Sequence, residues 1–497
     1  MQENVSQKRN FITEKSHLVI KRIILILISI QALIAGILLI KLLSMQILTW
    51  EYIISGILTV VIFNVLTGIA ARKQIMAVFM SVISLVVSGC LIWGLGVVLK
   101  LDHTFERMSQ TANTEIVQMA VIVLEDSPAV YISDISGYPV GYMEDESAGE
   151  IMQIIDECVD SDVSYHKYGN ALGLTDGLLT GMEEAIILNQ AYVGLIAEQS
   201  GYEDFAAQIR ILKTIDMEVI KTNTWRDAEA VSKEQMDIPS RKEDCLIVYI
   251  SGIDTFGGVN VKSRSDVNIL AVINRQKGQI QLINTPRDYY ISLPESGAKD
   301  KLTHAGLYGI PCSEGALEEL YGIEIDYYLR MNFSGFEQVI DTLGGIDVYS
   351  EYDFTVEPVR HYTTGYNHLS GIEALAFARE RYAFASGDIQ RGRNQMEVIK
   401  AMIRKLTSVE MLKNYDTILD KLSDAVQTDI PSEVLYDLVQ YQLKENTVWE
   451  VNSYTVTGTG SHATTYSMPS VTVYVMLPEQ KDIDQAKELI NNTLSEE

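Results

Sequence analysis

Three long apolar segments open the chain, and they restrict what it can fold into more than any other feature. They cover residues 23–43, 52–71 and 75–99. At about 1.5 Å per helical residue, each is long enough to cross a hydrocarbon core of about 30 Å. A secretory signal peptide does not explain them, because the first segment is too long and two more follow closely. We therefore predict a multi-pass membrane protein with three transmembrane helices within residues 23–99.

The basic residues beside these segments predict their orientation. Lysines and arginines gather before the first segment and between the second and third, at Lys8, Arg9, Lys15, Lys21, Arg22, Arg72 and Lys73. The positive-inside rule then makes residues 1–22 a cytoplasmic tail and places everything after residue 99 outside the cell membrane. Because no acid or base lies in the middle of a segment, we expect a plain anchor and no transport role.

The charge of the remaining chain excludes one class of partner. The net charge is −27, although the first hundred residues carry an excess of Lys and Arg. The part outside the membrane is therefore strongly acidic, and a nucleic-acid partner is not expected. Three of the four cysteines lie in that part, at Cys158, Cys245 and Cys312. They are too widely separated for a disulfide framework or a metal-site spacing, so we expect small buried side chains.

The part outside the membrane is too long for one ordinary domain. Residues 114–236 alternate short strands with helices and predict a small extracellular α/β accessory domain. Its expected strands cover residues 120–124 and 185–188, and its expected helices cover residues 149–159, 191–199 and 204–212. A charged stretch at residues 237–244 is typical of a linker. The second domain is then expected at residues 245–497.

The second domain begins with strands that end in charged residues. Residues 245–250 form an apolar run of strand length with Asp254 at its tip. A hairpin follows, with strands at residues 267–273 and 279–284. Arg264 and Asp266 lie at its entry and Arg287 at its far end, within the sequences SRSD and TPRD. Two residues apart in an extended chain, Arg264 and Asp266 face the same side.

Arginines next to carboxylates are typical of a site for a phosphate or pyrophosphate with its divalent cation. Asp254 and Asp266 can supply two hard oxygen ligands, and magnesium typically uses one or two carboxylates together with substrate phosphates. Arg264 and Arg287 can bind the phosphates that the metal bridges. Taken alone, an Arg-x-Asp pattern is more often a surface ion pair.

Two predicted helices carry the remaining candidates. Ser370 is expected to cap a helix over residues 371–381 that ends with Arg379 and Arg381. Asp388 is expected to cap a second helix that runs to about residue 406.

Asp388, Arg391 and Gln395 are spaced three and four apart, so they share one face at the N-terminus of the second helix, where the helix dipole favours an anion. Arg393 should point elsewhere. The alternative is a plain capping Asp388 with solvated arginines that pair with Glu380 or Glu397.

The run from residue 245 to 406 closely resembles the LytR-CpsA-Psr family of cell-wall ligases. The resemblance rests on SGIDTFG, SRSDVNILAVIN, INTPRDYY, DKLTHAGLYG, LGGIDV and FARERYAFASGDIQRGRNQ, and residues 449–494, read as two strands and a helix, look like the segment that completes the domain. It implies a mixed α/β catalytic domain with a central sheet flanked by helices, in a Gram-positive bacterium. One departure is Thr255, where many members have arginine.

The resemblance also implies an activity: Mg²⁺-dependent transfer of a glycopolymer, such as teichoic acid or capsule, from a polyprenyl pyrophosphate carrier to peptidoglycan. By that similarity Asp254 and Asp266 would bind the metal. The two phosphates would be held by Arg264, Arg287, Arg379, Arg381, Arg391 and Gln395. Asp388 would be a catalytic residue together with Arg391, orienting or deprotonating the acceptor hydroxyl. A carboxylate capping a helix should, however, have a low pKa and be a weak base.

Other functions stay open at this point. Water in place of the acceptor would make the protein a polyprenyl pyrophosphatase. A non-enzymatic sensor or membrane-bound transcription attenuator, working through residues 114–236, is the third possibility, although little of the chain would face the cytoplasm. Lys301 and His304 are further candidates for a base, but a lone histidine is more often structural.

Overall fold

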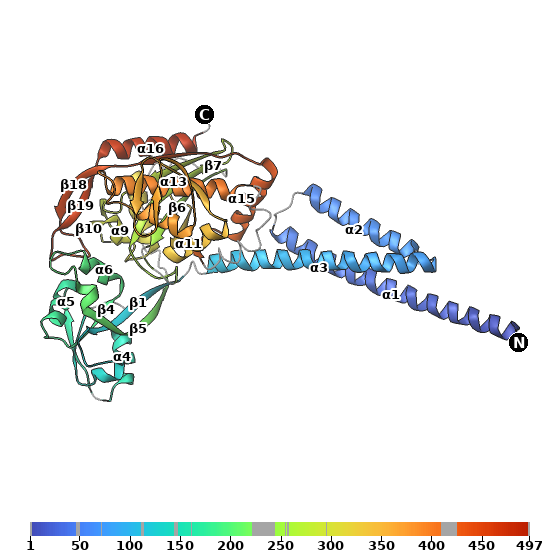
Figure 1. The fold of residues 1–497 in the computed structure, drawn as a ribbon, viewed down its shortest axis with the longest axis horizontal. Helices are drawn as coiled ribbons and strands as arrows, with labels where there is room; N and C mark the ends of the chain where they lie inside the picture. The colour runs from blue at the N-terminus through green and yellow to red at the C-terminus, as the bar shows by residue number, and fades with distance from the viewer. Residues whose placement is uncertain are drawn as a thin grey trace. The chain divides into compact units, whose positions relative to one another are not determined.

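The computed structural model describes residues 2–45, 50–70, 72–110, 114–143, 148–160, 162–220, 244–253, 255, 258–294, 296–408 and 425–495. The chain divides into two compact units (Figure 1). One comprises residues 1–107 and 430–447, and the other comprises residues 108–429 and 448–497. The predicted linker at residues 237–244 lies outside the described residues except for Asp244.

The first unit contains the three apolar helices predicted from the sequence. They are α1 (Gln2–Met45), α2 (Trp50–Ala70) and α3 (Gln74–Gln110), accompanied by the amphipathic α15 (Ser432–Glu445). The stretches long and apolar enough to cross a membrane are Arg22–Ser44, Trp50–Ala70 and Ile75–Lys100. Gln31 Nε2 donates to the Ser84 carbonyl oxygen at 2.7 Å, a buried hydrogen bond between α1 and α3.

The second unit begins with a five-stranded sheet in the order β3-β2-β4-β1-β5. Its elements are β1 (Thr114–Leu124), the 3₁₀ turn η2 (Ile132–Ile135), β2 (Pro139–Met143), α4 (Ala148–Cys158), β3 (Ser164–Tyr168), α5 (Ala171–Leu179), β4 (Ala185–Asn189), α6 (Ala191–Ala197), α7 (Phe205–Gln208) and β5 (Ile209–Ile220). We call this part the accessory module.

The helix predicted at residues 204–212 is wrong beyond its first turn. Its second half belongs to β5, which pairs antiparallel along the whole of β1. The alternation of apolar and polar residues from Ile209 to Ile220 has the period of a strand. Pairing with the buried β1 favours this strand over a helix.

A six-stranded mixed sheet forms the centre of the rest of this unit, in the order β16-β11-β6-β7-β8-β17. Its strands are β6 (Cys245–Ile253), β7 (Ser265–Asn274), β8 (Gln279–Asn284), β11 (Tyr327–Asn332), β16 (Val426–Thr428) and β17 (Glu450–Thr455). The antiparallel β7–β8 hairpin is the predicted one. Outside it, β17 pairs parallel with β8, and β11 pairs parallel with β6.

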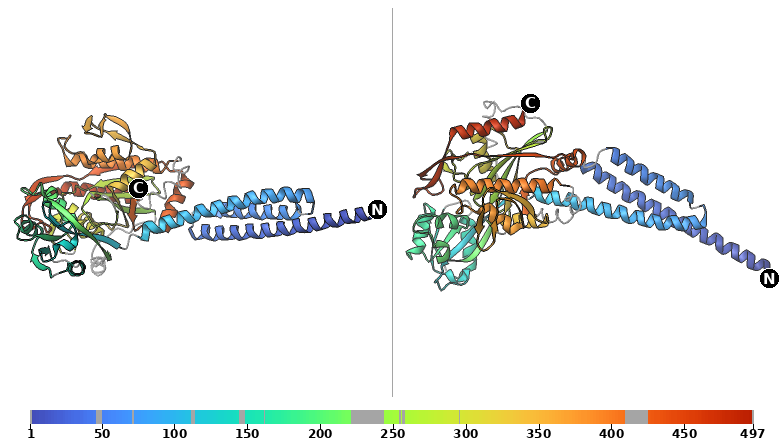
Figure 2. Two further views of the ribbon diagram at one scale, coloured as in Figure 1. Left: turned by 60° about the horizontal axis from the view of Figure 1, so that its bottom comes forward. Right: turned by 45° about the horizontal axis from the view of Figure 1, so that its top comes forward.

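Helices cover both faces of this sheet, as the mixed α/β prediction required. α10 (Ile310–Tyr321) and α16 (Gln480–Leu494) bury Leu317 and Ile490 against Leu270 and Ile283. The next residue of β8, Asn284, faces the other way, where α13 (Asp388–Leu406) packs. Figure 2 shows the red α16 and the orange α13 on opposite sides of the yellow-green strands.

Shorter elements complete the unit. They are β9 (Tyr290–Ser292), β10 (Lys299–Lys301), α9 (Leu302–Ala305), α11 (Phe333–Thr342), β12 (Ile346–Ser350), β13 (Phe354–Val356), β14 (Arg360–Tyr362), β15 (Gly365–Leu369), α12 (Gly371–Arg379), β18 (Gly458–Ala463) and β19 (Val473–Pro478). Residues 449–494 therefore hold three strands and a helix, one strand more than predicted. Cys90, Cys158, Cys245 and Cys312 are free thiols. Cys245 and Cys312 are buried as expected, but the expectation is wrong for Cys158, which is exposed at the end of α4.

Candidate functional site

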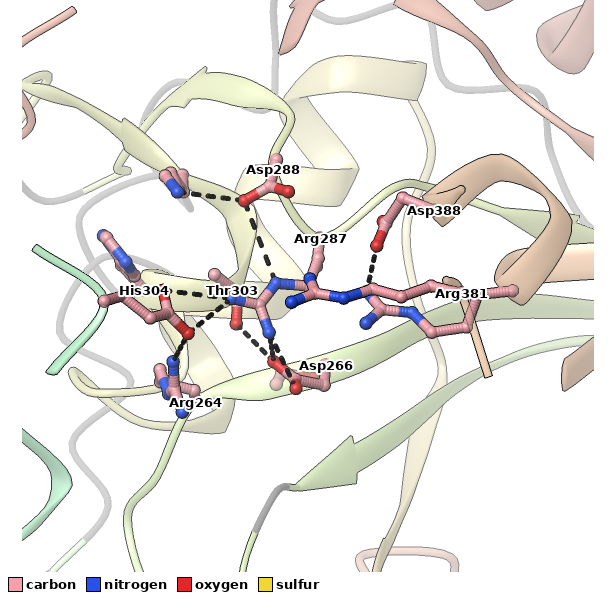
Figure 3. A network of polar contacts seen from close by, with 12 residues as sticks. Arg264, Asp266, Arg287, Asp288, Thr303, His304, Arg381 and Asp388 are labelled. Carbon is pink, nitrogen blue, oxygen red and sulfur yellow. Dashed lines mark hydrogen bonds and ion pairs between the residues drawn. The ribbon is translucent and has the colours of Figure 1, made fainter. Parts of the chain in front are cut away.

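The open end of the β7–β8 hairpin brings Arg264, Asp266 and Arg287 together. Tyr249 on β6 donates to Asn268 Oδ1 at 2.6 Å and contacts Ser265 Oγ at 3.0 Å, which fixes the first residues of β7. The hairpin register then places Asp266 opposite the segment that follows β8. Arg287 Nη1 donates to Asp266 Oδ1 at 2.9 Å and to Oδ2 at 2.8 Å, and Figure 3 shows this pair at the centre of the cluster.

Asp266 is held as an anion. Burial by itself raises the pKa of Asp266, but Arg287, Arg264 and Arg391 together outweigh it and lower the pKa below its ordinary value. Thr303 also donates to Oδ1, at 3.0 Å. The carboxylate therefore carries its charge at neutral pH and can act as a hard oxygen ligand.

A second carboxylate, Asp288, lies on the other side of Arg287. Lys301 Nζ approaches its Oδ1 at 3.0 Å, and Arg287 Nε approaches the same atom at 3.8 Å. Lys301 is thus a buried counter-ion of Asp288 and is poorly placed to work as a free base. Asp288 ends the TPRD motif and is a member of the cluster that was not predicted from the sequence.

His304 has a structural environment. Its Nδ1 lies 2.7 Å from Asp300 Oδ1 and 2.9 Å from Ser467 Oγ, and all three residues are buried. Burial by itself raises the pKa of Asp300, but the bonds from His304 and Ser467 lower it overall. The contact between His304 and Ser467 joins α9 to the segment before β19. This environment agrees with a structural role for the lone histidine.

α13 carries Asp388 and Arg391 into the site. Its N-cap is Gly387, with φ 50°, so Asp388 is the first helical residue and the predicted capping role is wrong. Oδ1 of Asp388 lies 2.6 Å from Arg391 Nη2. Gly392 allows the helix to approach the sheet, because a Cβ there would lie 2.2 Å from Asn284 Nδ2.

The expectation of a low pKa for Asp388 is also wrong. Burial raises its pKa, and the negative charge of Asp288 adds to the effect. Arg391, Arg287 and Arg381 oppose the shift without cancelling it. The helix terminus does not dominate because the carboxyl is largely withdrawn from water. A raised pKa makes Asp388 a better proton acceptor than a solvated aspartate.

The remaining predicted ligands lie nearby, with different surroundings. Arg381 follows the end of α12, donates to Tyr382 Oη at 2.7 Å and contributes to the electrostatic field at Asp388 (Figure 3). Arg379 is exposed, and its guanidinium lies 4.2 Å from the centre of the Phe333 ring.

Gln395 is buried and donates to the Ala378 carbonyl oxygen at 3.4 Å. Arg393 is exposed, as predicted from its rotation on the helix.

One charged member of the cluster was missed entirely. Glu198, the C-cap residue of α6 in the accessory module, contacts Arg264 Nη1 with its Oε1 at 2.5 Å and Arg287 Nη2 at 3.1 Å. Burial by itself raises the pKa of Glu198, but Arg287 and Arg264 lower it overall. No motif marks Glu198, because its role depends on contact with residues that are distant in the chain.

The described residues fit a magnesium ion that is bound partly through substrate. Asp254 lies outside them, and they contain no group of three His, Cys, Asp or Glu suited to a metal. Asp266 offers an anionic carboxylate, and one or two carboxylates plus phosphates are enough for magnesium. Within the same part of the chain, the buried Oδ1 atoms of Asp288 and Asp388 accept no hydrogen bond of good geometry. Both atoms nevertheless lie in ion pairs, with Lys301 Nζ and Arg391 Nη2, so the fit to magnesium rests on Asp266.

Comparisons with known proteins point to one family. The profile of the LytR_cpsA_psr family matches residues 212–491, more than half of the chain. The polyisoprenyl-teichoic acid–peptidoglycan teichoic acid transferase TagU of Bacillus cereus is 30% identical over 247 residues, which are 50% of this chain and 79% of that protein. TagU of Enterococcus faecalis is 31% identical over 209 residues, 42% of this chain and 68% of that protein. The crystal structure of B. subtilis TagV matches at 25% identity with a TM-score of 0.43, covering 51% of this chain and 98% of that one.

Proposed function

Because this chain belongs to the LytR_cpsA_psr family and is a transferase of the kind its relatives are named for, we propose that it attaches a glycopolymer, carried on a polyprenyl pyrophosphate, to peptidoglycan. The observation that carries the proposal is the convergence of Arg264, Arg287, Arg381 and Arg391 around Asp266 and Asp388. Buried or half-buried guanidinium groups gathered in one place are suited to binding two phosphates.

The proposed reaction replaces the phosphoanhydride linkage of the donor by a phosphodiester linkage to the acceptor. A hydroxyl of the acceptor, which we take to be the C6 hydroxyl of an N-acetylmuramic acid residue, attacks the phosphorus next to the sugar. A new oxygen–phosphorus bond forms and the bridging oxygen–phosphorus bond breaks, so that polyprenyl phosphate leaves. The arginines lower the barrier by neutralising charge on the phosphoryl oxygens and the leaving group.

Asp388 receives the acceptor proton in this proposal. Its raised pKa supports the role, since a general base works best when its pKa lies near the working pH. Arg391, 2.6 Å from Asp388, orients the carboxylate and binds phosphate from the same helical turn. Arg379 and Gln395 stay predicted phosphate ligands at the edge of the cluster.

Magnesium is part of the proposal and would be held by Asp266 and, as predicted, Asp254. When bound, it supplies positive charge to the phosphate oxygens. Asp266 contributes by staying anionic and by fixing Arg287, which binds both of its oxygens.

The three apolar helices and their flanking basic residues support an anchored protein with a cytoplasmic N-terminus and an extracellular catalytic domain. This arrangement would keep the site beside a membrane-bound donor and the cell wall.

Glycan transfer by the full-length protein in lipid nanodiscs tests the proposal. The donor is a labelled glycan on polyprenyl pyrophosphate, the acceptor is a peptidoglycan oligomer, and Mg²⁺ is present. We expect label on the peptidoglycan, lost with EDTA and in Asp266→Ala. Release of phosphate and free glycan without transfer would favour a pyrophosphatase instead. No turnover with any donor would favour a sensor.

A further inference from the structure

Glu198 reaches the phosphate-binding arginines from another folded part of the chain. Its carboxylate bridges two guanidinium groups, with Oε1 2.5 Å from Arg264 Nη1 and 3.1 Å from Arg287 Nη2. Oε2 is also within 3.4 Å of Arg287 Nη2. The two oxygens of the carboxylate are shared between the two arginines. Two oxygens of a phosphate would bind the same arginines in the same arrangement.

The terminal nitrogens of Arg287 are already engaged. Nη1 donates to both oxygens of Asp266, and Nη2 donates to both oxygens of Glu198. A phosphate that binds Arg287 through its fork must therefore displace one carboxylate. The side chain of Glu198 is 39% exposed, against 17% for Asp266. Glu198 is the partner that solvent and ligand can reach, and Asp266 is further tied by Thr303.

The position of Glu198 is set by a close-packed helix. α6 lies directly on Arg264, because a Cβ on Gly194 would be 2.9 Å from Arg264 Nη2. Only glycine allows the helix to approach so closely without moving the guanidinium. Glu198, the C-cap residue of this helix, therefore has its backbone close to the two arginines.

The accessory module is also joined to the segment that leads to Arg264. Ile116 on β1 donates its N–H to the Asn260 carbonyl oxygen at 2.8 Å and accepts from Lys262 N–H at 2.7 Å. Nearby, Glu115 Oε1 lies 2.7 Å from Arg330 Nη1, with both side chains almost completely buried. These contacts join the accessory module to residues 260–262, just before Arg264, and to β11, which carries Arg330.

We propose that Glu198 is a built-in competitor for the donor diphosphate: it occupies the place of phosphate oxygens on Arg264 and Arg287 and leaves when the donor binds. The accessory module thereby sets the affinity of the site. The inference rests on the proposed function in taking these two arginines as diphosphate ligands. It adds that a second part of the chain controls their availability.

The opposite role, in which Glu198 holds the arginines in place for the donor, predicts the opposite effect on binding. Arg287 is held by both oxygens of Asp266, so it does not need Glu198 for its orientation. Removing the negative charge of Glu198 should therefore strengthen the attraction of the arginines for an incoming anion. It should change little in the alignment that Asp266 gives to Arg287.

Isothermal titration of the full-length protein in nanodiscs with inorganic pyrophosphate and Mg²⁺ tests the inference. Glu198→Gln keeps the shape of the side chain and removes its charge. Because the displaced pair is partly exposed, we expect Kd to fall by about three- to tenfold. The matched control is Glu157→Gln, which removes one charge from an exposed position on α4 of the same module and should leave Kd unchanged.

The double variant gives an independent readout. If Glu198 acts through Arg264, the gain from Glu198→Gln should shrink in an Arg264→Gln background. An unchanged or weaker affinity in Glu198→Gln, while the wild type binds pyrophosphate and transfers glycan, would overturn the inference and leave the proposed function intact. Absence of binding in both proteins would overturn both. Binding by Glu198→Gln alone would support the inference in its strongest form.

Discussion

Arg287 and Asp266 face each other across the open end of the β7–β8 hairpin, with the guanidinium bound to both carboxylate oxygens at 2.8 and 2.9 Å. They are 21 residues apart in the chain, so the strand register brings them together. The same guanidinium also binds Glu198, so one planar group joins two carboxylates from different elements. The planar shape of arginine is therefore as important here as its charge.

Arg287→Lys tests the importance of that shape. Lysine keeps the charge but cannot bind Asp266 and a phosphate at the same time through parallel hydrogen bonds. We expect kcat/KM for glycan transfer to fall by about ten- to a hundredfold. Steady-state kinetics measure the effect, with Arg404→Lys, an exposed position on α13, as the control. Wild-type kinetics in Arg287→Lys would show that charge alone is sufficient.

Arg391 and Arg393 form a matched pair two residues apart on α13. Arg391 is buried and pairs with Asp388, whereas Arg393 is exposed. Arg391→Ala should reduce transfer by about a hundredfold or more, since it removes a charge aimed at the phosphates and also the partner of Asp388. Arg393→Ala should retain nearly full activity. Equal losses in the two variants would contradict the assignment.

Asp388→Asn should remove activity while it improves stability. Loss of a general base costs about 10²- to 10⁴-fold in rate. The folded pKa of Asp388 is raised, so between its unfolded and folded pKa values the folded protein binds more protons than the unfolded chain. Stability from this group is therefore lost as pH rises through that window, and neutral Asn avoids the loss.

Two measurements check the Asp388 prediction. Thermal unfolding at neutral pH should give a higher Tm for Asp388→Asn than for the wild type, and the difference should vanish at a pH below both pKa values. In the wild type, kcat/KM should rise with pH through the raised pKa, because only the carboxylate accepts a proton. A lower Tm for the variant at neutral pH would argue against a destabilising burial of Asp388.

The Glu115–Arg330 pair should be the most sensitive ion pair of the second unit. Both side chains are at most 1% exposed, so removing one partner leaves a buried charge uncompensated. Glu115→Ala should reduce the free energy of unfolding by about 3 to 5 kcal/mol. Asp347→Ala breaks the exposed pair with His368 and should cost at most about 1 kcal/mol. Urea unfolding compares the two, and similar losses would show that burial is not the cause.

Local patterns were sufficient for the elements that carry the site, since the apolar runs of β6, β7 and β8 and the turn between the last two are visible in the sequence. The start of α13 was predictable from Gly387 and Asp388, but the properties of Asp388 were not. Its raised pKa comes from burial and from the negative charge of Asp288, which is distant in the chain. The strand structure of residues 209–212 likewise depends on a distant element, because these residues pair with β1. Glu198 had no local signal at all.

The parallel pairing of β17 with β8 has a consequence for biosynthesis. β8 leads directly into the segment that carries Arg287, and its outer edge is covered only when Glu450–Thr455 has been added. Until then the strand presents unpaired backbone groups, which is the condition under which nascent sheets associate wrongly. A ribosome must therefore translate as far as Thr455 before the hairpin can acquire this neighbour. A premature stop upstream of β17 would yield a polypeptide with every arginine of the cluster and an unprotected sheet edge beside them.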